Sequence, residues 1–359
     1  MILPNRQLSV CQWLSLTLLA LAITYPVFSL GQPVPTELKI LNWAEYIDPD
    51  IVTEFERAFQ AKVTTHYFES EDDRDQLLAE RDGHDYDILM LNDLHLDRHA
   101  RRGWISPIEA DRIPNIEHID PRWLRRDSDG RLYGVPYFWG TAGIAYREDL
   151  VTAPPRTWHE LLEPTDSLRG KIAMIRSSRS LLAVALKSLG QSLNSADHAA
   201  LEHAEALLLA QKSYVGTYTY VGASEDSPLV TGKIWAAFLF NGDALALAKY
   251  QSKIVYLTPP EGSELWIDYL AIARHAEQPE LALAFINFLN DPQIAARNAQ
   301  YVYYATPNRA AAQLLPLEFI NNPIIYPNEA ILSHSELMQD LPPRTEKRVN
   351  EIALRVLAD

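Results

Sequence analysis

The sequence has a single cysteine, Cys11, and it lies in an apolar amino-terminal region. There the run WLSLTLLALAITYPVF follows one charged residue, Arg6, is interrupted by Pro26 and leads into small residues. This layout is typical of a secretory signal peptide, which we place at residues 1–31; an uncleaved membrane anchor is the alternative. Cleavage would leave a mature protein without thiols, which excludes disulfides, cysteine-ligated zinc and cysteine nucleophiles.

The sequence also lacks a second apolar segment of membrane-spanning length and the common catalytic and nucleotide-binding motifs, such as G-x-S-x-G, H-E-x-x-H and the P-loop. His84, His95 and His99 lie in a polar loop and helix, where we expect them to face solvent or to cap helices. The acidic run EDDRD is typical of a solvated helix face. We therefore expect an exported, soluble periplasmic protein that is not an enzyme and has no cofactor or metal.

Positive charge is scarce, because 32 Lys and Arg face 47 Asp and Glu, for a formal net charge of -15. This balance argues against nucleic acid as a partner and mildly favours a cationic ligand. The 359 residues, 47% of them hydrophobic, are enough for two globular domains.

The amino-terminal third alternates two patterns of hydrophobicity. Strand-like and helix-like patterns follow one another at 37–43, 47–62, 62–70, 71–83 and 86–92. Asp48 and Pro49 supply an N-cap and a first-turn proline for the first helix. A β-α-β-α-β order predicts a parallel sheet with ligands beyond the carboxyl ends of its strands, where LNWAEY and LNDLH lie.

The remainder of the chain predicts a second α/β region with no long linker before it. The extended stretch TAGIAYR leaves the first unit, and helical patterns at 178–190 and 196–211 alternate with strand patterns near 233–243 and 265–273. The helix expected at 278–291 places one face on Leu281, Ala284, Phe285 and Phe288. Two domains joined by extended strands would move about a hinge.

Aromatic residues stand beside carboxylates at several predicted strand ends. The groups are Trp43, Glu45 and Tyr46; Phe240 and Asp243; Trp266 and Asp268; and Tyr303 and Tyr304 before a Thr-Pro turn. Aromatic faces attract cations, and a desolvated carboxylate adds a directional partner, so such a group suits an alkyl ammonium ligand. Taken singly, each pair is better explained by ordinary core packing beside a solvated acid, but four such pairings at predicted strand ends favour a binding site.

Several stretches, in this order, resemble the periplasmic spermidine/putrescine-binding proteins of ABC transporters: LKILNWAEYIDPDIVTEFE, YDILMLND, YGVPYFWGTAGIAYR, LFNGDALALA, PPEGSELWIDYLAIA and YATPNRAA. The resemblance implies two α/β lobes of the type II-like periplasmic binding protein fold, which close on a small ligand in the cleft between them. It implies a first lobe of residues 37–143 plus 259–308 and a second of residues 144–258 plus 309–359.

The resemblance also implies a set of ligand-binding residues. They are Trp43, Glu45, Tyr46, Asn92 with Asp93 following, Phe240 where a Trp is usual, Asp243, Trp266, Asp268, Tyr304, and Gln339 or its neighbour Met338. The segment IRSSRS departs from the family, because Ser177 and Ser180 stand where the spermidine-binding branch has acids.

Burying an ammonium group without an anionic partner costs several kcal/mol, so the loss of these acids favours putrescine over spermidine. Arg176 or Arg179 could instead hold the carboxylate of a zwitterionic amino compound. Tyr303 and Tyr304 could serve as ferric iron ligands, and a sensing role at a membrane receptor is a further alternative. We expect a monomer that delivers a polyamine to the membrane permease of an ABC transporter.

Overall fold

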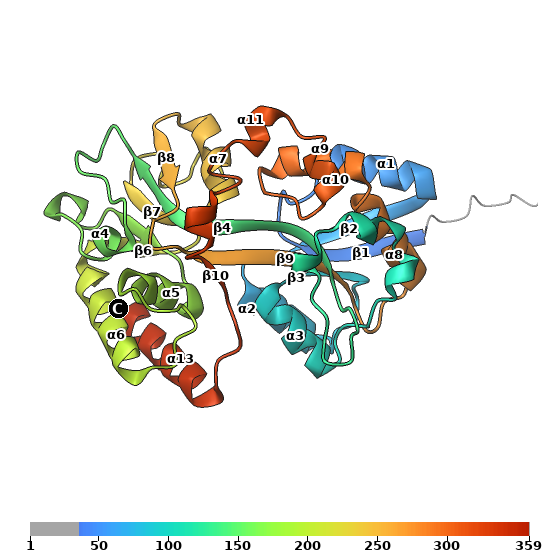
Figure 1. The fold of residues 1–359 in the computed structure, drawn as a ribbon, viewed down its shortest axis with the longest axis horizontal. Coiled ribbons are helices and arrows are strands. Elements are labelled where there is room, and N and C mark those ends of the chain that lie inside the picture. The colour runs from blue at the N-terminus through green and yellow to red at the C-terminus, as the bar shows by residue number, and fades with distance from the viewer. Residues whose placement is uncertain (1–35, 359) are drawn as a thin grey trace, which may run out of the picture. The chain divides into compact units, whose positions relative to one another are not determined.

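The computed structural model describes residues 36–358, so the predicted signal peptide lies outside the described residues. None of the described helices is long and apolar enough to cross a bilayer. Within residues 36–358 the chain forms one compact unit of helices around a mixed sheet (Figure 1).

The amino-terminal third folds as the alternation of patterns predicts. Its elements are β1 (Thr36–Asn42), α1 (Pro49–Phe59), β2 (Ala61–Tyr67), α2 (Glu71–Glu80), β3 (Ile88–Asn92) and α3 (Asp93–Arg102). β1 pairs in parallel with both β2 and β3. Asp48 caps α1 by accepting a hydrogen bond from the amide of Asp50 at 2.9 Å, and Pro49 begins the helix. The parallel arrangement and this cap are therefore confirmed.

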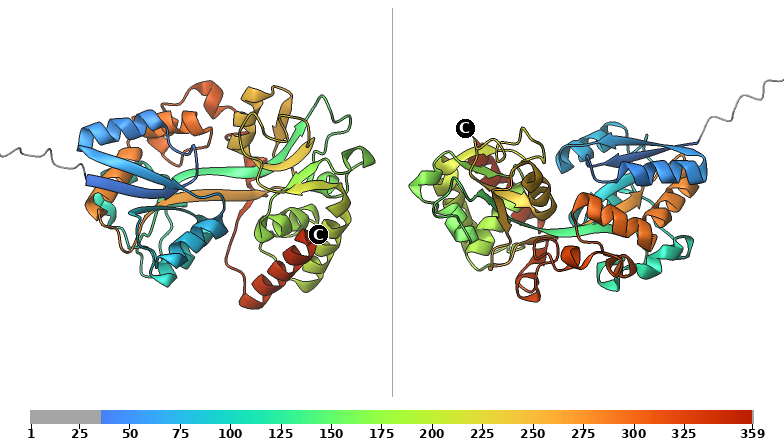
Figure 2. Two further views of the ribbon diagram at one scale, coloured as in Figure 1. Left: turned by 180° about the vertical axis from the view of Figure 1, so that it is seen from behind. Right: turned by 90° about the horizontal axis from the view of Figure 1, so that it is seen from above.

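Two long antiparallel strands connect the two halves of this unit. β4 (Val135–Arg147) pairs with β9 (Glu264–Ile272) over Val135–Thr141. Its second part, Ala142–Arg147, pairs with β7 (Ala236–Phe240) and β8 (Ile254–Leu257). Figures 1 and 2 show β4 and β9 side by side, with helices gathered at both of their ends. The same strand thus belongs to both halves.

The sheet order is β2-β1-β3-β9-β4-β7-β5-β6, with β8 and β10 paired off this path. The other strands are β5 (Ile172–Met174), β6 (Val215–Tyr218) and β10 (Glu336–Leu337). The middle of the chain adds α4 (Trp158–Leu162), α5 (Ser178–Ser188), α6 (His198–Gln211) and α7 (Asn241–Tyr250). The carboxyl-terminal part adds α8 (Pro279–Leu289), α9 (Pro292–Val302), α10 (Arg309–Ala312), α11 (Leu317–Ile320), α12 (Glu329–Leu332) and α13 (Pro343–Leu357). Short 3-10 turns lie at Ala110–Arg112, Pro114–His118, Pro121–Trp123, Asp166–Leu168 and Lys212–Tyr214.

Separate hydrophobic cores lie at the two ends of the β4–β9 pair. The first core packs β1, β3 and β9 against α1 and α8, and the second packs β5 and β7 against α5, α6 and α13. Ala311, Leu315, Phe319 and Ile325 belong to the first core, whereas the predicted second lobe begins again at residue 309. The bounds of the two lobes stay a prediction.

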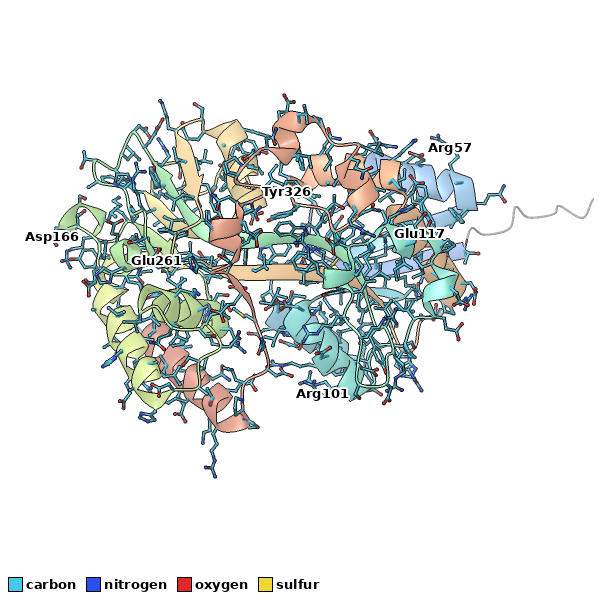
Figure 3. The ribbon with its side chains drawn as sticks, in the orientation of Figure 1. Arg57, Arg101, Glu117, Asp166, Glu261 and Tyr326 are labelled. Atoms are coloured by element: carbon cyan, nitrogen blue, oxygen red, sulfur yellow. The ribbon has the colours of Figure 1, made fainter. Side chains whose placement is uncertain are left out.

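Ion pairs join α3 of the first half to α13 of the second and to the segment just before it. Arg98 donates to Asp340 at 2.9 Å and to Glu346 at 2.6 Å, and Arg101 donates to Asp340 at 2.6 Å. Figure 3 labels Arg101 on this side of the molecule. Because these side chains are partly exposed, their attraction is screened by salt.

Three expectations about individual helices were wrong. His95 and His99 are buried on α3, and His99 lies 3.2 Å from Asp75. The acidic run on α2 is not simply solvated, because Arg74 within it is only 1% exposed and pairs with Asp75 at 3.0 Å.

The buried face of α8 also differs from the predicted one. It consists of Ala282, Leu283, Phe285, Ile286 and Leu289, while the other predicted residues are half-buried. The difference arises because α8 packs between β9 and neighbouring helices, so that more than one face is covered.

We expect Gly143→Ala to lower the free energy of unfolding by roughly 1–3 kcal/mol, as overpacking in a core does. Gly143 lies on β4, and a Cβ atom there would come within 2.5 Å of the carbonyl oxygen of Leu257 and of the Tyr256 ring. Gly222→Ala is the matched control, because its Cβ would meet nothing within 4 Å. Urea denaturation measures both variants, and equal stabilities would contradict the prediction.

Candidate functional site

The site begins where β1 ends and meets the middle of β9. Tyr46 follows the turn after β1, is 7% exposed, and donates its hydroxyl to Asp268 of β9 at 2.8 Å. Tyr137 fixes this turn by donating to the carbonyl of Tyr46 at 2.8 Å. Burial raises the pKa of Asp268 to about 7, although the Tyr46 hydrogen bond opposes the rise. Asp268 is therefore a buried carboxyl group that takes up a proton near neutral pH.

A second carboxyl group, half-buried, lies in the first turn of α7. Asp243 accepts hydrogen bonds from the hydroxyl of Tyr220, at 2.7 Å, and from Tyr304. Burial raises the pKa of Asp243 to about 6. The phenol pKa values of Tyr46 and Tyr304 are raised as well, first by burial and then by the neighbouring carboxylates. These phenols act as hydrogen-bond donors.

Four rings, Tyr46, Tyr304, Trp266 and Phe240, connect the two carboxyl groups, and we call them the aromatic belt. Tyr304 lies edge-on to Tyr46 at 5.9 Å and to Trp266 at 4.8 Å between ring centroids. Phe240 lies edge-on to Trp266 at 6.0 Å. The indole nitrogen of Trp266 is buried without a hydrogen-bond partner. The belt therefore offers ring surfaces between two acids, which suits an alkyl chain that carries ammonium groups.

Two glycines, which have no side chain, leave space for two of these rings. A Cβ at Gly242 would come within 2.5 Å of the Tyr304 ring, and one at Gly140 would come within 2.6 Å of the Trp266 ring. Gly242 precedes Asp243 on α7, and Gly140 pairs with Trp266 across the β4–β9 ladder. The absence of side chains at these two positions thus sets where the rings lie.

A third acidic region lies at the beginning of β9. Glu264 occupies the same face of the strand as Trp266 and Asp268, because alternate residues of a strand share a face. Burial raises the pKa of Glu264 to about 7, although Ser180 hydrogen-bonds the carboxylate. The pKa values of Glu71 and Asp93 are raised by burial too, and repulsion from Glu264 adds to the rise at Asp93.

These acids lack cationic partners. Within residues 36–358, no Lys or Arg forms an ion pair within 4.0 Å of Asp243, Glu264 or Asp268. Unpaired buried carboxylates are costly, and an ammonium group from a ligand would supply the missing charge. The arrangement is therefore chemically suited to bind an organic cation.

Among the other predicted site residues, some lie beside these acids. Asn92 pairs with Asp268 between β3 and β9, caps α3, and donates its amide to Glu71. Asp93 follows it and is 3% exposed. Ser180 lies beside Glu264 in the first turn of α5, and Ser177 caps that helix.

The remaining predicted residues make contacts of other kinds. Trp43 packs on Phe68 at 4.2 Å, and Glu45 lies exposed in the turn with a φ of 55°. Gln339 is exposed, and its neighbour Met338 is buried. The site-residue assignment as a whole stays a prediction.

The residues that would bind the alternative ligands have partners within the protein or lie exposed. Arg176 is exposed, and Arg179 donates to the carbonyl of Gln339 at 2.9 Å and to Asn194 at 3.1 Å. Tyr303 ends α9 in a left-handed conformation with the ammonium group of Lys249 4.3 Å above its ring, whereas Tyr304 turns to Asp243. No group of three or more His, Cys, Asp or Glu in the described residues could hold a metal ion.

Sequence reasoning missed Tyr220, Glu264 and Glu71 as members of this site. Glu264 had a recognisable signal, because ELWID places it two and four residues before Trp266 and Asp268 on one strand face. Tyr220 and Glu71 gave no such signal, because only the fold brings them to Asp243 and to Asn92.

Comparisons with known proteins also indicate a protein that binds a small molecule. Residues 50–327 match the family described as bacterial extracellular solute-binding protein. The chain is 30% identical over 352 residues to the putrescine-binding periplasmic protein SpuD of Pseudomonas aeruginosa. This match covers 92% of this chain and 95% of that protein. It is 31% identical over 307 residues to a norspermidine sensor of Vibrio cholerae, with 85% and 84% covered.

A solved structure shows the same architecture. The spermidine/putrescine ABC transporter substrate-binding protein PotD from Streptococcus pneumoniae superposes with a TM-score of 0.77 at 28% identity, over 89% of this chain and 98% of that one. The predicted α/β fold with two lobes is confirmed.

The raised pKa of Asp268 makes a prediction about stability. In the unfolded chain an Asp has a pKa of about 3.9, below the value of about 7 in the folded protein. The stability that comes from Asp268 is therefore fully present below about pH 4 and is lost as the pH rises through about 7.

We compare the unfolding free energies of the ligand-free wild type and of Asp268→Asn. The difference, wild type minus variant, should fall between about pH 4 and pH 8. Urea denaturation across this range measures the difference. The same difference for Asp111→Asn, an exposed site, should be flat. A flat difference for Asp268→Asn would contradict a raised pKa.

Proposed function

The chain belongs to the bacterial extracellular solute-binding proteins, and on that basis we propose that it captures a polyamine between its two halves and delivers it to an ABC permease. Proteins of this family bind small molecules for ABC transporters and are not enzymes, which confirms that part of the sequence-based prediction. The proposal concerns which small molecule is bound and what happens to it afterwards.

The observation that carries the proposal is a buried acid, Asp268, and a half-buried acid, Asp243, that flank the aromatic belt without cationic partners. Asp268 and Asp243 are each held by tyrosine hydroxyls, which orient the carboxylates but do not neutralise them. An alkyl diammonium ion would neutralise both and would lay its methylenes against the rings of the belt. The polyamines in the names of the relatives have this chemistry.

Putrescine is the smallest such ligand that carries two ammonium groups. The sequence favours it over spermidine because Ser177 and Ser180 carry no charge at the end where relatives have acids. That preference rests on the chemistry of those two positions.

We further propose that the protein acts as a periplasmic monomer, released after removal of residues 1–31. The relatives named above include a periplasmic protein, and a carrier that closes on its ligand must present both halves to the permease. The partly exposed ion pairs from Arg98 and Arg101 to Asp340 would then form only when the halves lie together.

Sensing is a second candidate function, and the similarity to a norspermidine sensor favours it. Closure around a ligand would serve a membrane receptor as well as a permease. The two functions share the ligand chemistry and differ in the membrane partner.

We expect isothermal titration to detect putrescine binding with micromolar affinity or better. The signal should come with proton release near pH 7, because an ammonium group favours the ionised forms of Asp268 and Asp243. Comparing the heats in buffers of different ionisation enthalpy measures that release.

Two other ligand classes serve as comparisons in the same titration. An amino-carboxylate would bind through Arg176 or Arg179, and ferric iron would give visible absorbance through tyrosinate ligands. Heat with an amino-carboxylate, or absorbance with ferric salt, together with silence for putrescine and spermidine, would overturn the proposal.

We expect Asp268→Asn to weaken putrescine binding by at least about tenfold, because the buried ammonium loses its charged partner. Asp111→Asn is the control and should leave the affinity unchanged, since Asp111 is exposed. Equal affinities for Asp268→Asn and the wild type would remove Asp268 from the binding site.

A further inference from the structure

Glu264 is an acid that the assignment of Asp268 and Asp243 leaves unused. It begins β9 on the face that carries Trp266 and Asp268. The strand pairs there with β10, so its backbone direction is fixed on that side. Glu264 therefore extends the line of Asp268 and Trp266 beyond the indole.

The carboxylate of Glu264 is only partly satisfied. Ser180 hydrogen-bonds it, but its Oε2 atom is buried and has no hydrogen-bond partner. Nearby, Asp93 is 3% exposed, and its Oδ2 atom is also buried without a partner. Burial raises the pKa of Asp93, and repulsion from Glu264 adds to the rise, so the two carboxyl groups lie in the same neighbourhood. Two buried oxygens in one region thus remain without donors.

The cations in the vicinity are engaged elsewhere. Arg179 donates to the carbonyl of Gln339 and to Asn194, and Lys187 donates to the carbonyl of His334 and to Glu336. Arg125 donates to the main-chain carbonyl of Asp93, not to its side chain, and pairs with Asp97 at 2.8 Å. Arg179 and Arg125 still lower the pKa values of Glu264 and Asp93 through their charges, but no ion pair within 4.0 Å to either side chain is found in the described residues. A ligand ammonium group would supply the direct partner that both carboxylates lack.

A purely structural role accounts for only part of this arrangement. An acid in the first turn of a helix, such as Asp93 on α3, interacts favourably with the helix dipole. That interaction does not provide a donor for Oδ2, and it does not apply to Glu264 on a strand. Retaining two such oxygens inside the protein is costly unless a ligand donates to them.

The spacing along β9 matches a particular ligand length. Glu264 and Asp268 are four residues apart, or about 13 Å at the rise of a strand. With bonds of roughly 1.5 Å, the nitrogens of extended putrescine lie about 6 Å apart and the terminal nitrogens of spermidine about 11 Å apart. Only the longer amine can approach both acids.

We propose that Glu264, together with Asp93, forms a second ammonium-binding subsite that holds the far amine of a triamine whose other amines lie at the aromatic belt. This inference rests on the proposed polyamine-binding function. In this arrangement Glu264 of β9 and Asp93 of α3 supply the negative charge for the far amine, which Ser177 and Ser180 cannot supply. A triamine such as spermidine then binds at least as tightly as putrescine, the reverse of the preference drawn from those serines.

The test is isothermal titration of the full mature chain with putrescine and with spermidine. Glu264→Gln keeps the size of the side chain and removes its charge. We expect it to weaken spermidine binding by at least about tenfold and putrescine binding by less than about threefold. Asp93→Asn should lower the spermidine-to-putrescine affinity ratio in the same direction, and Glu318→Gln, at an exposed site, should leave it unchanged.

The outcomes separate this inference from the function on which it rests. A wild type that binds neither amine overturns the polyamine proposal itself. A wild type that binds both, with an unchanged affinity ratio in Glu264→Gln, overturns the second subsite alone, and so does a wild type that clearly prefers putrescine. Should Glu264→Gln lose both ligands, the ratio in Asp93→Asn decides the matter.

Discussion

The antiparallel pairing of β4 with β9 is the constraint on which the rest of the structure depends. β4 contributes one part to each half of the molecule, so the two hydrophobic cores are joined through continuous backbone hydrogen bonds. β9 presents Glu264, Trp266 and Asp268 on one face beside this junction. The proposed binding residues on β9 are therefore carried by a regular strand where the two halves join, and a strand positions side chains more firmly than a loop does.

Electrostatics ties the site to the fold. Acids placed in water would hold ordinary pKa values, but here burial raises the pKa of Asp243, Glu264 and Asp268. Tyrosine and serine hydroxyls orient the carboxylates without supplying charge. The folded protein thus retains an electrostatic cost that the proposed cationic ligand would remove, so the same groups would influence both binding and folding stability.

Much of the fold and part of the site could be predicted from the sequence. The periodicity of hydrophobic residues predicted β1, α1, β2, α2 and β3, and Asp48 predicted the start of α1. These features depend on near neighbours in the chain. The acids Asp243 and Asp268 were recognised beside their aromatic neighbours. Glu71, His95 and His99 were misjudged because their burial depends on how α2 and α3 pack together, which local polarity does not report.

Gly242 shows how a position without a side chain can govern the charge of its neighbour. Any larger residue there would push the Tyr304 ring away, and with it the hydroxyl that reaches Asp243. Burial and Tyr220 have the larger effects on the pKa of that carboxyl group, and the space left by Gly242 contributes through Tyr304. A change in which ligands are recognised could arise at this glycine while every charged and aromatic residue of the site stays the same.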